Sequence, residues 1–138
     1  MDAFDTDVLI YAAGAGHVLG ERVRALFARL PGGPGDVVGI GSVLLVPEVL
    51  SKPMRDRDEG EVAELGSFLS RLELIAADLA IADLGASMGA AYRLRAADAI
   101  HLATAVAAGA DRFITNNRSD FPKSIVEVDV TYPEDLPE

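Results

Sequence analysis

Apolar residues along this chain follow two alternating patterns. Short apolar runs are typical of strands buried in a sheet, and longer segments with apolar residues three or four positions apart are typical of amphipathic helices. The short runs predict five strands, at 1–5, 36–40, 72–76, 112–115 and 125–130. The second pattern predicts helices from residue 7 onward and over 19–30, 43–50, 62–72, 79–93 and 96–108. Because strands and helices alternate, we expect a three-layer α/β/α sandwich whose central five-stranded sheet is mainly parallel.

The segments between these elements are polar, small or rich in helix-breaking residues. Residues 14–20 are expected to be flexible, and the Pro- and Gly-rich segment 31–35 ends the second helix. The charged stretch 51–60 is expected to form a solvated loop, and the acidic segment 132–138 is expected on the surface. A chain of 138 residues without a repeat or linker is long enough for one domain to bury about two thirds of its unfolded surface. We therefore predict a single domain over 1–138.

The composition removes several classes of function. The chain has no cysteine, which excludes disulfides, zinc–thiolate sites and thiol nucleophiles. No apolar run approaches the roughly 20 residues that a transmembrane helix needs, and the N-terminus is acidic where a signal peptide would be basic. We therefore expect a cytoplasmic protein with no membrane partner.

The net charge of −10, from 22 acidic and 12 basic residues, is unfavourable for binding nucleic acid. A local basic patch can still bind phosphates, because binding depends on the charges near the site. Two groups of basic residues lie close in sequence to the polar segments described next. They are Arg93 and Arg95, and Arg112, Arg118 and Lys123.

Acidic or amide side chains stand where a predicted strand meets a helix, or within an apolar helix. They are Asp5, Asp7, Glu48, Asp98 and the run 116–120, which contains Asn116, Asn117 and Asp120. Each has a structural explanation of its own. Asp7 can cap a helix, Glu48 can lie on an exposed face, Asp98 can interact with a helix dipole, and the asparagines can serve a turn. Ligands bind at the carboxyl ends of parallel strands, so we expect these groups to lie together at that end.

A cluster of carboxylates is unfavourable without a cation, because like charges raise the pKa of at least one member. Oxygen ligands without a histidine or cysteine cluster favour Mg²⁺, with Mn²⁺ as the alternative. Such an ion lowers the pKa of bound water and favours displacement at phosphorus. Thr6, Ser42 and Thr115 carry hydroxyls that can orient the water. His101 shares a helix face with Asp98, where a single histidine is more typical of a packed residue than of a base.

Four motifs, in this order, resemble those of PIN-domain ribonucleases. They are Asp5-Thr6-Asp7-Val8-Leu9-Ile10-Tyr11, Pro47-Glu48-Val49-Leu50, Asp98-Ala99-Ile100-His101-Leu102-Ala103-Thr104-Ala105, and Phe113-Ile114-Thr115-Asn116-Asn117 through Asp120-Phe121. The length of the chain is similar to that of the VapC-type toxins of toxin–antitoxin pairs. The resemblance covers nearly the whole chain and implies a PIN-like fold.

The resemblance also implies an activity, a site and partners. The activity is that of a Mg²⁺-dependent endoribonuclease, with Asp5, Glu48 and Asp98 as metal ligands and with Asn117 or Asp120 in the place of a fourth catalytic acid. As a toxin, the protein would cut RNA, bind an antitoxin with a basic inhibitory segment and form a homodimer. The sequence departs from the family at Asp7, where Asn or Ser is usual, and at Asn117, where an acid is usual.

A second interpretation is an RNA-binding or assembly module with the same fold and a degenerate metal site. Asn117 favours this interpretation, because an amide replaces an expected carboxylate. The presence of Asp5, Glu48 and Asp98 opposes it.

Overall fold

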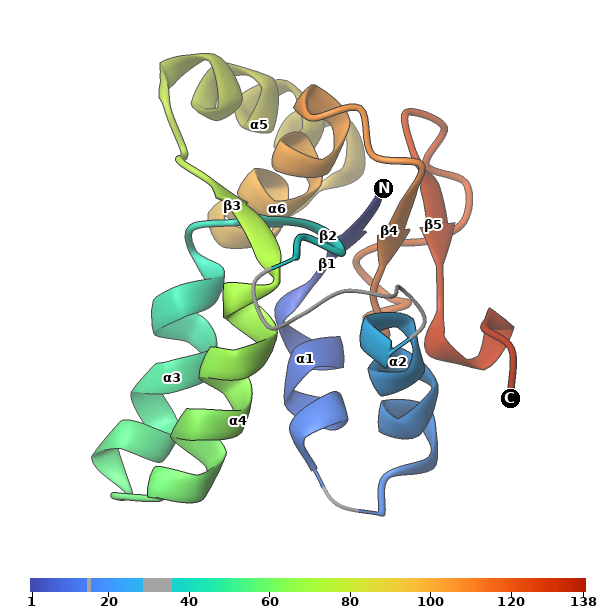
Figure 1. Cartoon of the computed structure of the whole chain (residues 1–138). Coiled ribbons are helices and arrows are strands. Elements are labelled where there is room, and N and C mark those ends of the chain that lie inside the picture. The colour runs from blue at the N-terminus through green and yellow to red at the C-terminus, as the bar shows by residue number, and fades with distance from the viewer. Residues whose placement is uncertain (15, 29–35) are drawn as a thin grey trace.

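The computed structural model describes residues 1–14, 16–28 and 36–138, and its centre is a five-stranded sheet with strand order β3-β2-β1-β4-β5 (Figure 1). Every pairing in this sheet is parallel. The strands are β1 (Asp2–Phe4), β2 (Gly39–Ser42), β3 (Leu72–Ile75), β4 (Arg112–Ile114) and β5 (Asp129–Thr131). The chain adds β2 and β3 on one side of β1 and β4 and β5 on the other, so the strand order reverses at β1.

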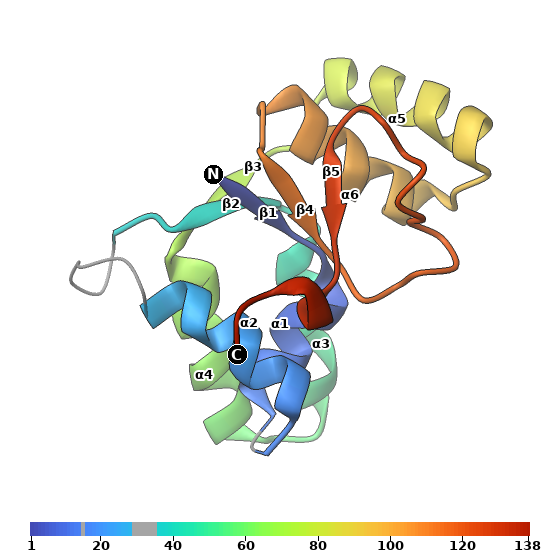
Figure 2. The ribbon, with the colours of Figure 1, turned by 90° about the vertical axis from the view of Figure 1, so that its right-hand side faces the viewer.

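Helices cover both faces of the sheet, with α1 to α4 on one face and α5 and α6 on the other (Figure 2). They are α1 (Thr6–Ala13), α2 (Val18–Ala28), α3 (Leu45–Arg55), α4 (Glu59–Ser70), α5 (Leu79–Tyr92), α6 (Ala96–Ala107) and the short 3-10 helix η1 (Pro133–Asp135). In the described ranges, every helix is too short or too polar to cross a bilayer.

Neighbouring residues of the central strands contribute to opposite cores, because the side chains of a strand alternate between its two faces. Phe4 and Ile114 pack with α1 to α4, whereas Ala3 and Phe113 pack with α5 and α6. All four side chains are buried. The predicted α/β/α sandwich with a five-stranded sheet is therefore confirmed.

Two strands differ from their predicted limits by more than one residue at an end. β2 begins at Gly39 rather than at residue 36, and a Cβ at Gly39 would lie only 2.6 Å from Phe4 Cε2, so β1 and β2 approach closely there. β5 covers Asp129–Thr131 rather than 125–130. Ile125 is buried as a strand residue would be, but its backbone N donates to Pro122 O in a turn (3.1 Å).

The stretch 51–60 is not the solvated loop that its charges predict. α3 continues to Arg55 and α4 begins at Glu59, so residues 56–58 alone connect the two helices. Pro53 lies buried inside α3, where it contributes to packing although proline is usually a sign of a break. Asp58 starts α4 by accepting a hydrogen bond from Glu61 N (3.1 Å). The charges of this stretch are therefore the exposed faces of two helix ends.

The start of α2 falls within the segment 14–20 that was expected to be flexible. Gly20 is buried in this helix, and a Cβ there would lie 2.0 Å from Tyr11 O, so α1 and α2 cross in close contact. The end predicted for this helix at residue 30 and the break predicted over 31–35 lie outside the described residues.

The C-terminal segment packs onto the body of the protein, and the expectation that it lies on the surface is wrong for its apolar residues. Tyr132 and Leu136 are only 7% and 3% exposed. Arg22 of α2 donates to Glu134 O (2.7 Å) and Leu136 O (3.4 Å). Leu136 belongs to the core on the α1–α4 face. Its burial could not be predicted from the sequence, because the residues around it are acidic.

Candidate active site

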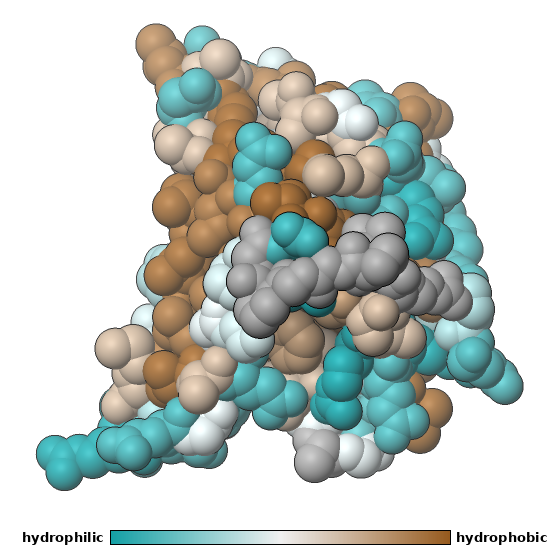
Figure 3. All heavy atoms as spheres, viewed as in Figure 1, coloured by the Kyte–Doolittle hydropathy of each residue, from teal (hydrophilic) through white to brown (hydrophobic). Residues whose placement is uncertain are grey.

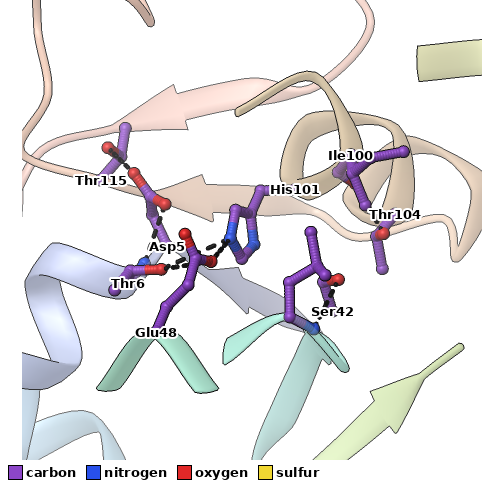
Figure 4. Close-up of polar contacts among 9 residues, drawn as sticks. Asp5, Thr6, Ser42, Glu48, Ile100, His101, Thr104 and Thr115 are labelled. Atoms are coloured by element: carbon purple, nitrogen blue, oxygen red, sulfur yellow. Dashed lines mark hydrogen bonds and ion pairs between the residues drawn. The ribbon is translucent and has the colours of Figure 1, made fainter. Parts of the chain in front are cut away.

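Asp5 lies directly after β1, at the point where the strand order reverses. Its carboxylate is 5% exposed and accepts hydrogen bonds from Thr6 N and from Thr115 Oγ1, both at 2.8 Å (Figure 4). Asp5 is the N-cap of α1, a role that the sequence offered to Asp7. Burial raises the pKa of Asp5 more than these hydrogen bonds and nearby His101 lower it. The protein thus holds a fixed carboxyl group in a site that disfavours its charge.

The segment after β4 supports Asp5 from the neighbouring strand. Thr115 Oγ1 donates to Asp5 and accepts a hydrogen bond from Asn117 N (3.1 Å). The Asn117 side chain donates to Asp120 Oδ2 (2.9 Å) and accepts from Asp120 N (3.3 Å). Asn117 therefore shapes the loop and orients Asp120.

Asp98 lies in the first turn of α6 and is half-buried. Burial, Asp5 and Asp120 all raise the pKa of Asp98, with burial the largest cause. The charges of Asp5 and Asp120 add to the effect of burial, which indicates that both carboxylates are near Asp98. Of the two residues predicted for the fourth acidic position, Asp120 is the one whose charge acts on Asp98.

Glu48 reaches the same place from α3. Its Oε1 accepts a hydrogen bond from Thr6 Oγ1 (3.1 Å) and contacts Nε2 of His101 (Figure 4). Glu48 also raises the pKa of Asp5, which shows that the two charges are close. The side chain of Glu48 is 34% exposed, whereas that of His101 is 1% exposed.

Asp7 is turned toward the segment after β4. Its Oδ2 accepts a hydrogen bond from Asn116 N (3.0 Å), and among the described residues its buried Oδ1 has no partner. Burial and the charge of Asp5 raise the pKa of Asp7 to about 7. The extra acid of this chain is therefore an unfavourable charge within the cluster, as the sequence indicated.

The three candidate hydroxyls divide into two groups. Thr6 and Thr115 bond the acidic residues directly. Ser42, in contrast, accepts a hydrogen bond from Leu44 N (3.1 Å) before α3 begins, which is a structural role. The contact between His101 and Glu48 was not predicted. In the sequence, the only indication of this contact was that Asp98 and His101 are three residues apart and therefore share a helix face.

The donor atoms of this site suit a hard divalent cation, because they are carboxylate and hydroxyl oxygens and because one buried carboxylate oxygen has no partner among the described residues. In the ranges that the structure describes, no three or more His, Cys, Asp or Glu side chains already form a metal cage. The chemistry of the donors therefore fits a cation.

Three of the five basic residues that lie close in sequence to the polar segments pair with acids of the chain. Arg118 pairs with Glu134 and Lys123 with Asp135, both at 2.6 Å, and both cations lie over the ring of Tyr132. Arg112 pairs with Asp2 (2.8 Å). These pairs neutralise three basic side chains with acids of the chain itself. On the face viewed in Figure 3, hydrophobic residues gather on the left-hand side and hydrophilic residues mainly on the right.

Comparison with protein families assigns this arrangement to a known class. Residues 3–123 match the PIN domain, and the chain belongs to the PIN domain family. The resemblance that the motifs indicated is thereby confirmed. A search among curated proteins found no match.

Solved structures with the same fold are parts of toxin–antitoxin assemblies. A chain of a toxin–antitoxin complex from Klebsiella pneumoniae is 25% identical with a TM-score of 0.72, and the match covers 96% of this chain and 98% of that chain. A chain of VapBC2 from Rickettsia felis, bound to a promoter DNA fragment, is 19% identical with a TM-score of 0.70, covering 95% and 97%. A chain of DNA-bound VapBC from Salmonella typhimurium is also 19% identical with a TM-score of 0.70, covering 96% and 97%. The fold of this chain is therefore similar to that of VapC-type toxins over nearly its full length.

Proposed function

We propose that this protein is a Mg²⁺-dependent endoribonuclease and the toxin of a type II toxin–antitoxin pair. The observation that carries the proposal is that Asp5 follows the central strand β1 of a PIN-family sheet, where the strand order reverses, and that Thr6 bonds both Asp5 and Glu48. Ligands bind at such a point in open α/β sheets. The likeness to chains of toxin–antitoxin complexes supports the biological role.

In this proposal Asp5, Glu48 and Asp98 hold the cation, and Asp120 supplies the fourth acid. When bound, Mg²⁺ or Mn²⁺ would lower the pKa of a water and neutralise charge at the phosphate. Thr115 and Thr6 keep Asp5 in one orientation by bonding its two oxygens. Asn117 does the same for Asp120. The chain thus supplies fixed oxygen ligands in a partly buried site, where electrostatic effects are stronger than in water.

The test is cleavage of a labelled single-stranded RNA with Mg²⁺ and with chelator, for the parent and for Asp98→Asn. We expect cleavage by the parent only with Mg²⁺ or Mn²⁺. Loss of a ligand should reduce it at least about 100-fold, because even the partners of ligands are typically worth 10–100-fold. Asp83→Asn makes the same chemical change at an exposed position of α5 and should cleave like the parent. Undiminished cleavage by folded Asp98→Asn would refute the proposed mechanism.

The alternative, a binding module with a degenerate site, gives a different result in the same experiment. Such a module would bind RNA equally well with chelator and with Mg²⁺, and it would cut under neither condition. Asn117 no longer favours this alternative, because its amide orients a carboxylate that stands beside Asp98.

We further propose that the cognate antitoxin inhibits by placing an Arg or Lys among these carboxylates. A guanidinium pairs well with two carboxylates, and a net charge of −10 favours encounter with a cationic segment. Inhibition should disappear when the basic residues of that segment are replaced, and Mn²⁺ affinity should fall in the inhibited complex. A complex that keeps full Mn²⁺ affinity and tolerates these replacements would contradict the idea. A homodimer belongs to the same proposal and rests on the family resemblance, and a cytoplasmic location rests on the composition of the sequence.

A further inference from the structure

Glu48 differs from the other acids of the site in how it is held. Asp5 is fixed by a backbone N–H and a buried hydroxyl, whereas Glu48 extends from an exposed position of α3 on a longer side chain. Among the described residues, both of its contacts are made by one oxygen, Oε1, with Thr6 Oγ1 and with Nε2 of His101. In the described part of the chain, its other oxygen, Oε2, makes no hydrogen bond.

Packing alone does not explain why a histidine occupies position 101. The side chain is 1% exposed on the buried face of α6, and its Nδ1 has no hydrogen-bond partner in the described part of the chain. Burying an unpaired polar atom is unfavourable, so an aliphatic residue filling this space would make the fold more stable. Among the described residues, Nε2 of the ring contacts Glu48 and, at 3.4 Å, Thr6 Oγ1. The reason for a histidine here is therefore its contact with the site.

The contacts form one continuous path between two of the proposed ligands. His101 Nε2 contacts Glu48 Oε1, and Thr6 Oγ1 donates a hydrogen bond to the same oxygen. Thr6 N donates to Asp5 Oδ1 at 2.8 Å. Figure 4 shows the four side chains of this path converging between α1, α3 and α6. A carboxylate accepts hydrogen bonds and cannot donate them, so the ring donates through Nε2.

We propose that His101 is a positioning residue, which orients Glu48 toward Asp5 and thereby sets the affinity of the acidic site for a divalent cation. The inference rests on the proposed metal-dependent function. Groups that hydrogen-bond to metal ligands typically change metal affinity 10–100-fold. Without the donor, Glu48 would lose one of its two contacts at Oε1 and be less ordered, so the cation would have to order it on binding.

The experiment measures Mn²⁺ binding directly, by calorimetry and by electron paramagnetic resonance, without RNA. His101→Leu removes the donor at similar size, and His101→Gln keeps an amide N–H near the position of Nε2. We expect His101→Leu to weaken Mn²⁺ binding about 10-fold or more and His101→Gln to restore most of the loss. His101→Asn, whose amide is one carbon shorter, should resemble His101→Leu.

A double-mutant cycle shows whether the effect passes through Glu48. In a Glu48→Gln background the ring has no carboxylate to orient, so His101→Leu should cause little further loss of Mn²⁺ affinity. An equal loss in both backgrounds would overturn the inference, and so would parent-like affinity in His101→Leu. If His101→Leu does not fold, the contrast between the Gln and Asn variants decides, and equal Mn²⁺ affinities for those two would overturn the inference.

A separate control identifies failure of the proposed function itself. Asp5→Asn should weaken Mn²⁺ binding in the parent whatever the role of His101. If the parent binds no Mn²⁺, or binds it independently of Asp5, then the proposed metal site is wrong. Binding that depends on Asp5 but not on His101 overturns only the positioning role.

Discussion

At the scale of single residues, burial and like charge act in the same direction on the carboxyl groups after β1. Both raise the pKa of Asp7, from 3.8 to about 7, and the pKa of Asp98 is raised for the same reasons. Between about pH 4 and 7 the folded protein therefore keeps a proton on Asp7 that the unfolded chain has already released. Stability falls with rising pH wherever the folded state binds more protons. Without a cation, these groups make the fold less stable at pH 7 than at pH 5.

Asp7→Asn tests this account, because an amide keeps the size of the side chain and can still accept from Asn116 N. In chelator, the variant should be more stable than the parent at pH 8, where the parent must ionise Asp7 in the fold. At pH 5 the stability gain of the variant over the parent should be smaller than at pH 8. The difference between the two gains should be at most about 2–3 kcal/mol, because pH 5 lies two units below the pKa of Asp7. Thermal melts at pH 5 and 8 measure it, with Asp83→Asn as the matched control. An equal gain at both pH values would show that Asp7 does not titrate in this way.

The residues of the site were predictable from the sequence to different degrees. Asp5 and Asp98 stand at strand and helix boundaries, and their place follows from the alternation of elements. The neighbours of Glu48 could not be predicted, because its contact with His101 depends on how α3 and α6 are placed. The division of roles between Asn117 and Asp120 depends on the shape of a loop that no periodicity describes.

At the scale of elements, glycine positions distinguish close helix contacts from open surface. A Cβ at Gly20 would lie 2.0 Å from Tyr11 O, so Gly20→Ala would force α1 and α2 apart. We expect a loss of about 1–3 kcal/mol or more in the free energy of unfolding. Gly66, inside α4, has nothing within 4 Å of its Cβ position. Gly66→Ala should therefore stabilise by about 0.5–1 kcal/mol, through helix propensity alone.

Denaturant unfolding of both variants gives the comparison. The same substitution in two helices should move the midpoint in opposite directions. If Gly20→Ala is as stable as Gly66→Ala, then α1 and α2 are not in the close contact described above.

The elements predicted best are those in which the apolar residues of the sequence pattern are the residues that the structure buries. α5 and α6 match their predicted ranges to within one residue at each end, because their apolar residues face one core. The stretch 51–60 was mistaken for a loop, because the charges and Pro53 have the composition of a loop while the backbone remains helical. Leu136 is one apolar residue in an acidic segment, and only the position of α2 makes it part of a core.

At the scale of the whole molecule, the topology determines which acids meet. β1 lies between β2 and β4, so the segments that follow these strands converge on Asp5. Thr115 comes after β4 and Glu48 comes from the helix after β2. Alternating elements predict parallel strands but not their order. The alternation therefore predicted that the acids lie at one end of the sheet, and only the family resemblance indicated which of them form a site.

The same convergence makes the metal-free protein electrostatically unfavourable, and a cation should reverse this. Asp5 and Asp120 both raise the pKa of Asp98, so removing the charge of Asp98 should relieve repulsion in the folded state. We expect Asp98→Asn to melt at a higher temperature than the parent in chelator, although a substitution ordinarily costs about 1 kcal/mol. Asp83→Asn, with the same loss of charge on an exposed part of α5, should melt like the parent.

Magnesium should then reverse the order of the melting temperatures of the parent and Asp98→Asn. A ligand that binds only the folded state stabilises it by about 2.7 kcal/mol at a hundred times its dissociation constant. The parent should gain this stability, and Asp98→Asn should lose most of the gain because one ligand is missing. Four thermal melts, of each protein with chelator and with Mg²⁺, measure both effects. A variant that melts lower in chelator and still gains fully from Mg²⁺ would make Asp98 a helix-start residue outside the metal site.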